Sequence, residues 1–188
     1  MFKFIGRLHG GFFGFFQRNL QEWLPGFLAR LVFAGVLFMY FFNSAKTKVG
    51  EGFEGLFQLQ DGAFAQILPA LMEKNSYDVS AIPFVPYHLI VYAGTYAEFI
   101  LPVLIVLGLF TRIAAVGMIG FVIVQSIVDI TAHHADAETI GAWFDGITAS
   151  AILDQRALWM FIFVYLFIYG AGKISLDYLF AGRRANRM

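Results

Sequence analysis

Four stretches of this sequence are apolar enough and long enough to cross a lipid bilayer. A bilayer core about 30 Å thick takes about 20 apolar residues in a helix that rises about 1.5 Å per residue. The stretches occupy residues 25–42, 84–109, 113–131 and 157–176. The chain is 59% hydrophobic, whereas an ordinary soluble domain has about 45–50% apolar residues. We therefore predict an all-α integral membrane protein, built as a four-helix bundle.

We interpret residues 25–180 as one membrane domain, because no polar or proline-rich linker divides them. Residues 110–112 alone connect the second and third helices, so this pair is predicted to form an antiparallel hairpin. The long connections contain apolar residues mixed with acids and glycines at 53–72 and 139–153, as expected of interfacial segments. Residues 1–24 are predicted to be an amphipathic interfacial segment, and residues 181–188 a basic tail.

The charged residues are distributed unevenly between the two sides of the predicted membrane. The side of the termini has nine basic residues and two acids, whereas the other side has four basic residues and nine acids. The basic residues of the first side are Lys3, Arg7, Arg18, Arg30, Arg112, Lys173, Arg183, Arg184 and Arg187, and those of the second are Lys46, Lys48, Lys74 and Arg156. Because Lys and Arg favour cytoplasmic loops, we predict cytoplasmic N- and C-termini and both long loops outside, in a periplasm.

Several classes of chemistry are excluded or unsupported. The chain has no cysteine, which excludes disulfides, thiolate metal sites and thiol redox chemistry carried by its own residues. Its formal net charge is zero, so nucleic acid is not an expected partner. No phosphate-binding loop, no nucleophile with its base and no dinucleotide fingerprint is present. The lipid bilayer is the expected environment of most of the chain.

One acidic residue, Glu98, falls near the middle of the second helix. An ionisable group inside the bilayer costs about 2.5–3.5 kcal/mol on insertion scales, so it requires a partner or a function. Gln125 of the third helix is expected at a similar depth, and Tyr96 and Arg30 are further candidates for a polar site. Glu98 is either a proton-handling or quinone-head-group contact, or a buried carboxyl that pairs with Arg30 or Gln125 and fixes helix register.

A second polar set is predicted at the cytoplasmic rim. It consists of Arg112 in the hairpin turn, and of Lys173 and Asp177 at the end of the fourth helix. An ion pair between Arg112 and Asp177 would tie the turn to the end of that helix, and we favour this structural role over ligand binding. Exposed ion pairs usually contribute less than about 1 kcal/mol, so the pair would matter only if partly buried.

Histidines near the outer ends of two helices raise the question of a metal site. His88 opens the second helix, and His133 and His134 close the third, where Asp129 is four residues before His133. Imidazole and carboxylate groups suit zinc, iron or copper. Their spacing matches no established motif, however, so a metal or haem site is disfavoured against ordinary polar groups at helix ends.

Three segments together resemble the DoxX family over roughly residues 25–180. They are FLARLVFAGVLFMYFFNSAKTKVG with Arg30 and Lys46, YAEFILPVLIVLGLFTRIAAVGM with its Ala-Glu, Gly-Leu and Thr-Arg pairs, and the ending GAGKISLDYLF. The resemblance implies a compact four-helix protein of the bacterial inner (cell) membrane. It also implies a link with quinone-dependent sulfur or thiosulfate oxidation, or with membrane complexes that handle oxidative stress. It does not imply one activity.

Three functions follow as hypotheses. The leading one is an auxiliary membrane subunit of a quinone-linked redox assembly, not catalytic on its own, with a lipophilic ligand near Glu98 and with other membrane or periplasmic subunits as partners. Quinone is the candidate cofactor. The second is an interaction or assembly protein whose outer loops dock a periplasmic partner. The third is a small-solute or proton carrier, suggested by the intramembrane acid; the lack of a visible internal repeat weakens it.

Overall fold

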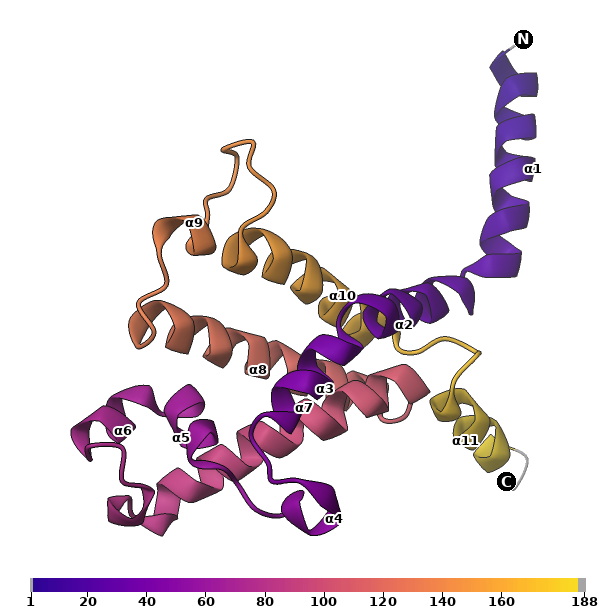
Figure 1. Ribbon diagram of the computed structural model, residues 1–188. Coiled ribbons are helices and arrows are strands. Elements are labelled where there is room, and N and C mark those ends of the chain that lie inside the picture. Colours follow the sequence, from indigo (N-terminus) through magenta and orange to yellow (C-terminus); the bar gives the residue numbers. More distant parts are fainter. Residues whose placement is uncertain (1, 186–188) are drawn as a thin grey trace.

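Helices account for all regular elements in the part of the chain that the structure describes. The computed structural model describes the backbone of residues 2–185 and the side chains of residues 10–182. Three segments, Phe84–Leu107, Thr111–Thr131 and Ala151–Tyr169, are long and apolar enough to cross a membrane. The pair Leu24–Val36 and Phe38–Lys46 passes the same test as one bent span. The predicted all-α membrane bundle is thereby confirmed (Figure 1).

The described part of the chain contains both long helices and short helical segments. They are α1 (Phe2–Leu20), α2 (Leu24–Val36), α3 (Phe38–Lys46), α4 (Gly52–Gly55), α5 (Asp61–Ile67), α6 (Pro69–Lys74), η1 (Val79–Ala81), η2 (Phe84–His88), α7 (Leu89–Leu107), α8 (Thr111–Thr131), α9 (Ala137–Ile140), η3 (Ala151–Gln155), α10 (Arg156–Tyr169) and α11 (Leu176–Ala185). The side chains of Lys3, Arg7, Arg183, Arg184 and Arg187, and with them most of the predicted basic tail, lie outside the described residues.

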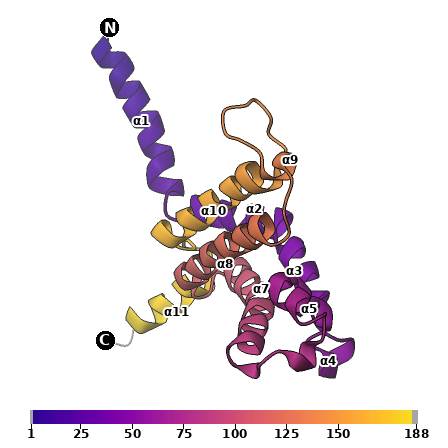
Figure 2. The same ribbon diagram turned by 90° about the vertical axis from the view of Figure 1, so that its left-hand side faces the viewer.

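The bundle has two ends. α4, α5, α6 and α9 gather at one, called the loop end, while α1 and α11 lie at the other, called the termini end (Figures 1 and 2). α1 points away from the bundle in both views. α1 covers residues 2–20 of the predicted N-terminal segment, whose place at a membrane interface stays a prediction.

The first span is not the single straight helix predicted over residues 25–42. α2 and α3 meet at Leu37 with a bend of 43°, and α3 continues to Lys46. Gly35 lies two residues before the break, where the missing side chain makes helical backbone less favourable. The bend allows Phe33 and Phe41, on its two sides, to pack together in the core with ring centroids 6.5 Å apart.

The last span also ends earlier than the predicted range 157–176. α10 stops at Tyr169, because Gly170 and Gly172 take φ values of +77° and +78° that only glycine adopts readily. α11 then begins as a separate helix at Leu176. The predicted hairpin of the second and third spans is confirmed: α7 and α8 are joined by three residues, with Gly108 and Phe110 both in the left-handed region.

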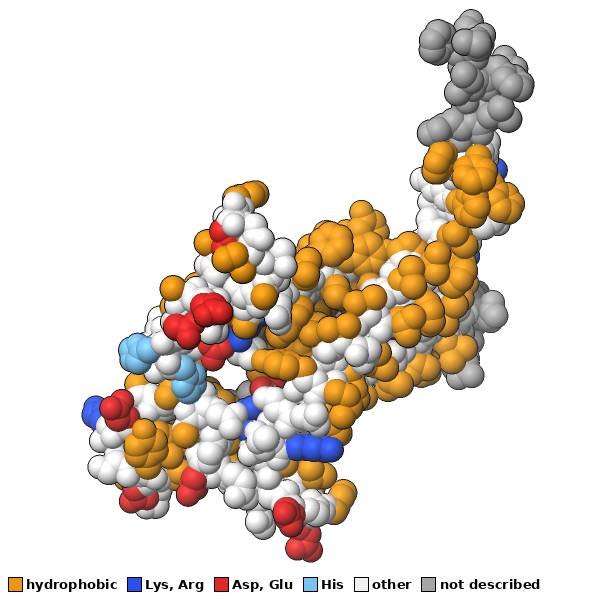
Figure 3. All heavy atoms as spheres, turned by 45° about the horizontal axis from the view of Figure 1, so that its top comes forward, with side chains coloured by type: hydrophobic (Ala, Val, Ile, Leu, Met, Phe, Trp, Pro, Cys, Tyr) orange, Lys and Arg blue, Asp and Glu red, His pale blue; other side chains and the backbone are white. Residues whose placement is uncertain are grey.

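The core lies between α2, α3, α7, α8 and α10. Its buried members are Phe33, Leu37, Phe41, Ile105, Ala114, Ala115, Met118, Val122, Phe163 and Leu166. Large apolar side chains also cover the outside of the spans, and Figure 3 shows them as a nearly continuous surface over the helices. Such a surface requires lipid around it, because a water-soluble monomer rarely exposes contiguous apolar patches of that extent.

A smaller apolar cluster closes the loop end. Ala63 and Phe64 of α5, Met72 of α6, Val91 of α7 and the loop residue Ile82 are buried together there. The segment that the sequence predicts as interfacial is therefore folded against the start of α7. This packing brings α5 to the edge of the polar site described next.

Candidate functional site

A buried ion pair joins the first and second spans. Lys48 Nζ donates to both carboxylate oxygens of Glu98, at 3.2 Å to Oε1 and 2.8 Å to Oε2. The Ser44 hydroxyl donates to Glu98 Oε1 at 3.3 Å and accepts from Lys48 Nζ at 2.8 Å. Lys48 is 3% exposed and Glu98 5%. Each charge thus has a partner of opposite sign, which burial away from water demands.

A compact turn after α3 holds Lys48 in this place. The backbone N–H of Gly50 donates to the carbonyls of Gly55 and Gln58, and the N–H of Gln60 donates to the carbonyl of Lys48. A Cβ on Gly55 would lie only 2.4 Å from the Gly50 carbonyl carbon, so the close approach requires glycine. The turn directs the lysine side chain back along α3, where its ammonium also reaches the Ser44 carbonyl at 3.2 Å.

Beside this pair lies a cavity of about 550 Å³. Its walls come from α3, α5, α7 and α8, and its polar lining residues are Ser44, Lys48, Gln66, Glu98, Gln125, Asp129 and His133. The rest of the lining is apolar or glycine. The loop end is hollowed in Figure 3, with basic, acidic and histidine side chains gathered around the hollow. The cavity therefore combines one polar cluster with largely apolar walls.

Small residues keep this cavity open. Gly120 of α8 lines it, and a Cβ added there would meet no atom within 4 Å. Gly94 and Gly117 also line it, but a Cβ on either would press against Ile67 or Leu101 respectively. Of the three lining glycines, Gly120 is thus the one at which a Cβ would enter open space without touching a neighbour.

Gln125 contributes an unused hydrogen-bond acceptor to the site. Its amide nitrogen donates to the Tyr40 hydroxyl at 3.0 Å, while its Oε1 is buried without a partner among the described residues. The predicted hydrogen bond between Gln125 and Glu98 is not formed, although both residues line the same cavity. Glu98 is satisfied by Lys48 and Ser44 instead.

A second ion pair lies next to the cavity. Arg156 Nη2 donates to Asp129 Oδ2 at 2.5 Å, and Arg156 Nη1 donates to the Ser126 hydroxyl at 2.9 Å. Arg156 opens α10 and is 7% exposed. The pair ties α10 to α8, and Asp129 also lines the cavity. Two loop-side basic residues, Lys48 and Arg156, are thus neutralised by acids of the spans.

Arg30 does not approach Glu98, and the predicted pairing of the two is wrong. Its guanidinium donates to four backbone carbonyls at the termini end, those of Ile105, Val106, Ala171 and Ile174, at 2.5 to 3.3 Å. These carbonyls belong to the last turn of α7 and to the segment after α10, where helix ends leave acceptors unpaired. Arg30 therefore clamps the end of α7 to the segment after α10.

The other predicted candidates also find separate partners. Tyr96 donates its hydroxyl to the Leu56 carbonyl at 2.9 Å and does not line the cavity, so its predicted place beside Glu98 is wrong. His88 bonds the Ile82 carbonyl, and His133 bonds the Gln66 carbonyl. Asp129 pairs with Arg156, as described above. No group of three metal-ligating side chains forms within the described residues, so His88, Asp129, His133 and His134 are not brought together.

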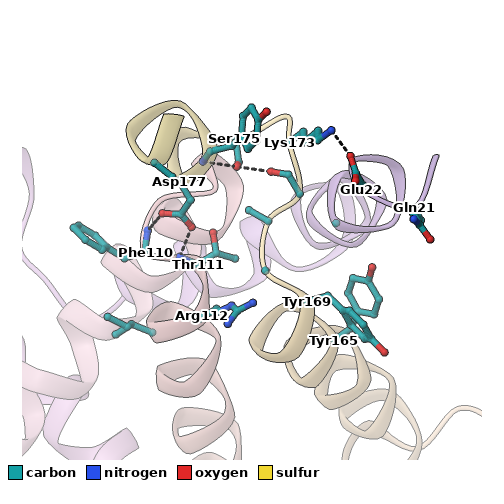
Figure 4. Close-up of a pocket in the computed structure, with 17 residues that line it drawn as sticks. Gln21, Glu22, Phe110, Thr111, Arg112, Tyr165, Tyr169, Lys173, Ser175 and Asp177 are labelled. Carbon is teal, nitrogen blue, oxygen red and sulfur yellow. Dashed lines mark hydrogen bonds and ion pairs between the residues drawn. The ribbon is translucent and has the colours of Figure 1, made fainter. Parts of the chain in front are cut away.

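The rim residues are close in space but differ from the predicted Arg112–Asp177 pair (Figure 4). Asp177 accepts from the backbone N–H groups of Phe110 and Thr111, at 2.7 and 2.9 Å. These N–H groups begin α8 and have no carbonyl partner within the helix, so the carboxylate caps it. Lys173 pairs with Glu22, and hydrogen bonding to that acid raises the pKa of the lysine. Asp177 thus ties the hairpin turn to α11 by capping.

Sequence reasoning missed Lys48, Ser44 and Arg156 as members of the site. The sequence places Lys48 and Arg156 on the outer side, because one follows an apolar stretch and the other precedes one. One signal could have found them: Glu98 and Asp129 are acids inside predicted spans and need cations, and these two basic residues flank spans of the same bundle. Local sequence does not say which cation reaches which acid.

Comparison with known proteins identifies one family. The DoxX family model matches residues 26–134, more than half of the chain, and every residue that lines the cavity lies in that range. Searches of the curated proteins and of the solved structures found no match. Residues 135–180, which include the last span, lie outside the matched range. The chain is a membrane protein that belongs to the DoxX family.

Proposed function

We propose that this protein is an auxiliary, ligand-binding membrane subunit of a quinone-linked redox assembly, and that the cavity beside Lys48 and Glu98 receives the quinone head group. The observation that carries the proposal is a cavity of about 550 Å³ between membrane-spanning helices, with one polar cluster and apolar walls. A lipophilic molecule with a small polar head matches that distribution of groups.

The polar groups suit both redox forms of such a head group. A quinone carbonyl accepts hydrogen bonds. The Lys48 ammonium would donate one by giving up a bond to Ser44, because its three N–H groups are already used by Ser44 and Glu98. A quinol hydroxyl donates hydrogen bonds, and Glu98 and the unpartnered Oε1 of Gln125 would accept them. The chain has no cysteine, so no thiol of its own could exchange electrons with the quinone.

Quinone binding can be measured by fluorescence quenching of Trp159. Its ring lies 5.2 Å from the ring of Tyr40, which in turn bonds Gln125 at the cavity. In a variant that keeps only this tryptophan, a short-chain ubiquinone analogue in detergent should quench the emission saturably. Gly120→Leu should abolish saturable quenching because its side chain fills the cavity, and Glu98→Gln should change the affinity.

Gly62→Leu is the matched control, since Gly62 is helical, exposed and has open space around it but does not line the cavity. It should leave the quenching curve unchanged. Quenching that rises linearly with quinone, to the same extent in Gly120→Leu as in the parent, would reflect partition into the micelle and would overturn the proposal.

We also propose that the termini end faces the cytoplasm of a bacterial inner membrane. Support comes from the free positive charges, because Lys and Arg not held in ion pairs are what orient a membrane protein. At the loop end Lys48 and Arg156 form ion pairs with acids of the spans. The basic residues that remain there are Lys46 and Lys74, and acidic residues outnumber them. Among the described side chains, ion pairs hold two of the four cations at the loop end and one cation, Lys173, at the termini end.

A second candidate function is the docking of a periplasmic partner at the loop end. Several large apolar side chains are exposed at the loop end, outside the membrane-spanning segments, namely Phe53, Phe57, Trp143, Phe144 and Ile147. Replacing Phe53 and Phe57 by serine should remove a partner from a native co-purification while quinone quenching persists. Retention of all co-purifying subunits would argue against docking through these two residues.

A further inference from the structure

A second cavity, of about 750 Å³, lies at the termini end of the bundle. Its walls come from the connection between α1 and α2, the first turn of α8, the end of α10 and the start of α11 (Figure 4). The spans α8 and α10 begin and end at this level, so the cavity lies at the edge of the membrane. It shares no lining residue with the cavity beside Glu98.

Arg112 is the charged side chain of this cavity that no other described group neutralises. Lys173 is paired with Glu22, and Asp177 is held by the backbone N–H groups that open α8. The Arg112 side chain has no hydrogen bond or ion pair with any described residue. In Figure 4 its guanidinium extends from α8 toward the end of α10, where Tyr165 and Tyr169 lie.

Several residues with hydroxyl groups line the same cavity. Tyr165 and Tyr169 line it with their rings stacked at 4.9 Å, one turn apart on α10. Thr111, also a lining residue, is fully buried, and its Oγ1 lacks a hydrogen-bond partner among the described residues. Burying a hydroxyl without a hydrogen-bond partner is costly. An occupant of the cavity that accepts a hydrogen bond from Thr111 would remove this cost.

We propose that this cavity binds the phosphate group of an anionic phospholipid. The planar guanidinium of arginine donates two parallel hydrogen bonds to phosphate oxygens, and Thr111 and the tyrosines would donate further ones. Ile113 and Phe110 line the cavity and are 71% and 61% exposed, so they offer apolar surface to the acyl chains. Basic pockets between spans at a membrane surface bind anionic head groups in this way.

Trp23 follows the lining residue Glu22 directly in the chain and allows a test; its indole Nε1 donates to the Asn19 carbonyl of α1 at 2.9 Å. The Trp23 carbonyl lies 2.9 Å from where a Cβ on Gly172 would be, and Gly172 lines the cavity. In a variant that keeps only this tryptophan, reconstituted in phosphatidylcholine vesicles, bromine-labelled phosphatidylglycerol should quench the emission more than bromine-labelled phosphatidylcholine. We expect a preference of about fivefold, the factor that corresponds to about 1 kcal/mol for one basic residue.

Arg112→Gln should reduce this preference to near unity, and Arg112→Lys should retain part of it, because the charge remains while the planar fork is lost. Both variants should fold, since Arg112 is exposed and no hydrogen bond or ion pair joins its side chain to a described residue. Lys46→Gln removes an equally exposed charge at the loop end and should leave the preference unchanged.

Three results would overturn the proposal. The first is equal quenching by the two lipids in the parent. The second is a preference that survives in Arg112→Gln. The third is loss of the lipid preference on adding millimolar inorganic phosphate at constant ionic strength, which would identify a site for a free anion. Persistence of the preference in inorganic phosphate is the expected outcome for a lipid.

Discussion

Lys48 and Glu98 are fifty positions apart in the chain, yet the lysine ammonium lies 2.8 Å from the nearer carboxylate oxygen in the interior of the protein. The acid belongs to the middle of α7 and the base to the turn that follows α3. Both are almost fully buried. Neither charge would be tolerated there alone, so the pair couples the fold of the loop end to the packing of the spans.

Removing one member of this pair should destabilise the protein strongly. Lys48→Met leaves the Glu98 carboxylate buried without a cation, so the free energy of unfolding should fall by about 3–5 kcal/mol. The double variant Lys48→Met/Glu98→Leu should recover much of the loss. Unfolding in SDS, followed by circular dichroism, measures both changes. Lys46→Met is the control and should lie close to the parent; a single variant as stable as the control would contradict the importance of the pair.

Replacing Arg30 by lysine should destabilise the protein. Its guanidinium donates to carbonyls of two segments, and the single ammonium of a lysine cannot reach both. Hydrogen bonds from charged donors contribute about 1.5–3 kcal/mol each, so Arg30→Lys should lower the unfolding free energy by roughly 3 kcal/mol. Thermal unfolding in detergent tests this. A melting temperature within a degree or two of the parent would show that the clamp is dispensable.

Gly108 should not accept a side chain. Its φ is +66°, and a Cβ there would lie 2.8 Å from the Arg30 guanidinium and 2.7 Å from Ser175 Cβ. The backbone conformation alone costs about 1–2 kcal/mol for an L-residue, and the contacts add to it. Gly108→Ala should therefore melt well below the parent. Gly62→Ala, on an exposed helical turn with open space, should be neutral or slightly stabilising.

Membrane orientation can be mapped with single cysteines, because the chain has none of its own. Tyr77→Cys at the loop end and Ala181→Cys on α11 are both at exposed positions. In intact cells whose outer membrane has been made permeable, a maleimide that cannot cross the inner membrane should label position 77 alone. After lysis it should label both. Labelling of position 181 in intact cells would place the termini on the outer side.

Part of the site was accessible to sequence reasoning. Glu98 stands out because a carboxyl in an apolar run is costly, and Gln125 is at a matching depth by counting along two antiparallel helices. Both line the cavity. Neither predicted partner of Glu98 pairs with it, because Arg30 binds carbonyls at the termini end and Gln125 bonds Tyr40. The depth of a residue in the membrane can be estimated by counting along its helix. Which residue of another helix lies next to it cannot be found in this way.

The sequence by itself determined that the protein is helical and spans a membrane, where the spans lie, and that two of them form a hairpin. Those properties depend on the length and composition of each stretch, because lipid requires every backbone polar group to be paired within a helix. Only the tertiary structure decided the 43° bend at Leu37, the glycine break after Tyr169 and which cation meets which acid. These depend on how distant segments pack, since the turn after α3 carries Lys48 to Glu98 and α10 carries Arg156 to Asp129.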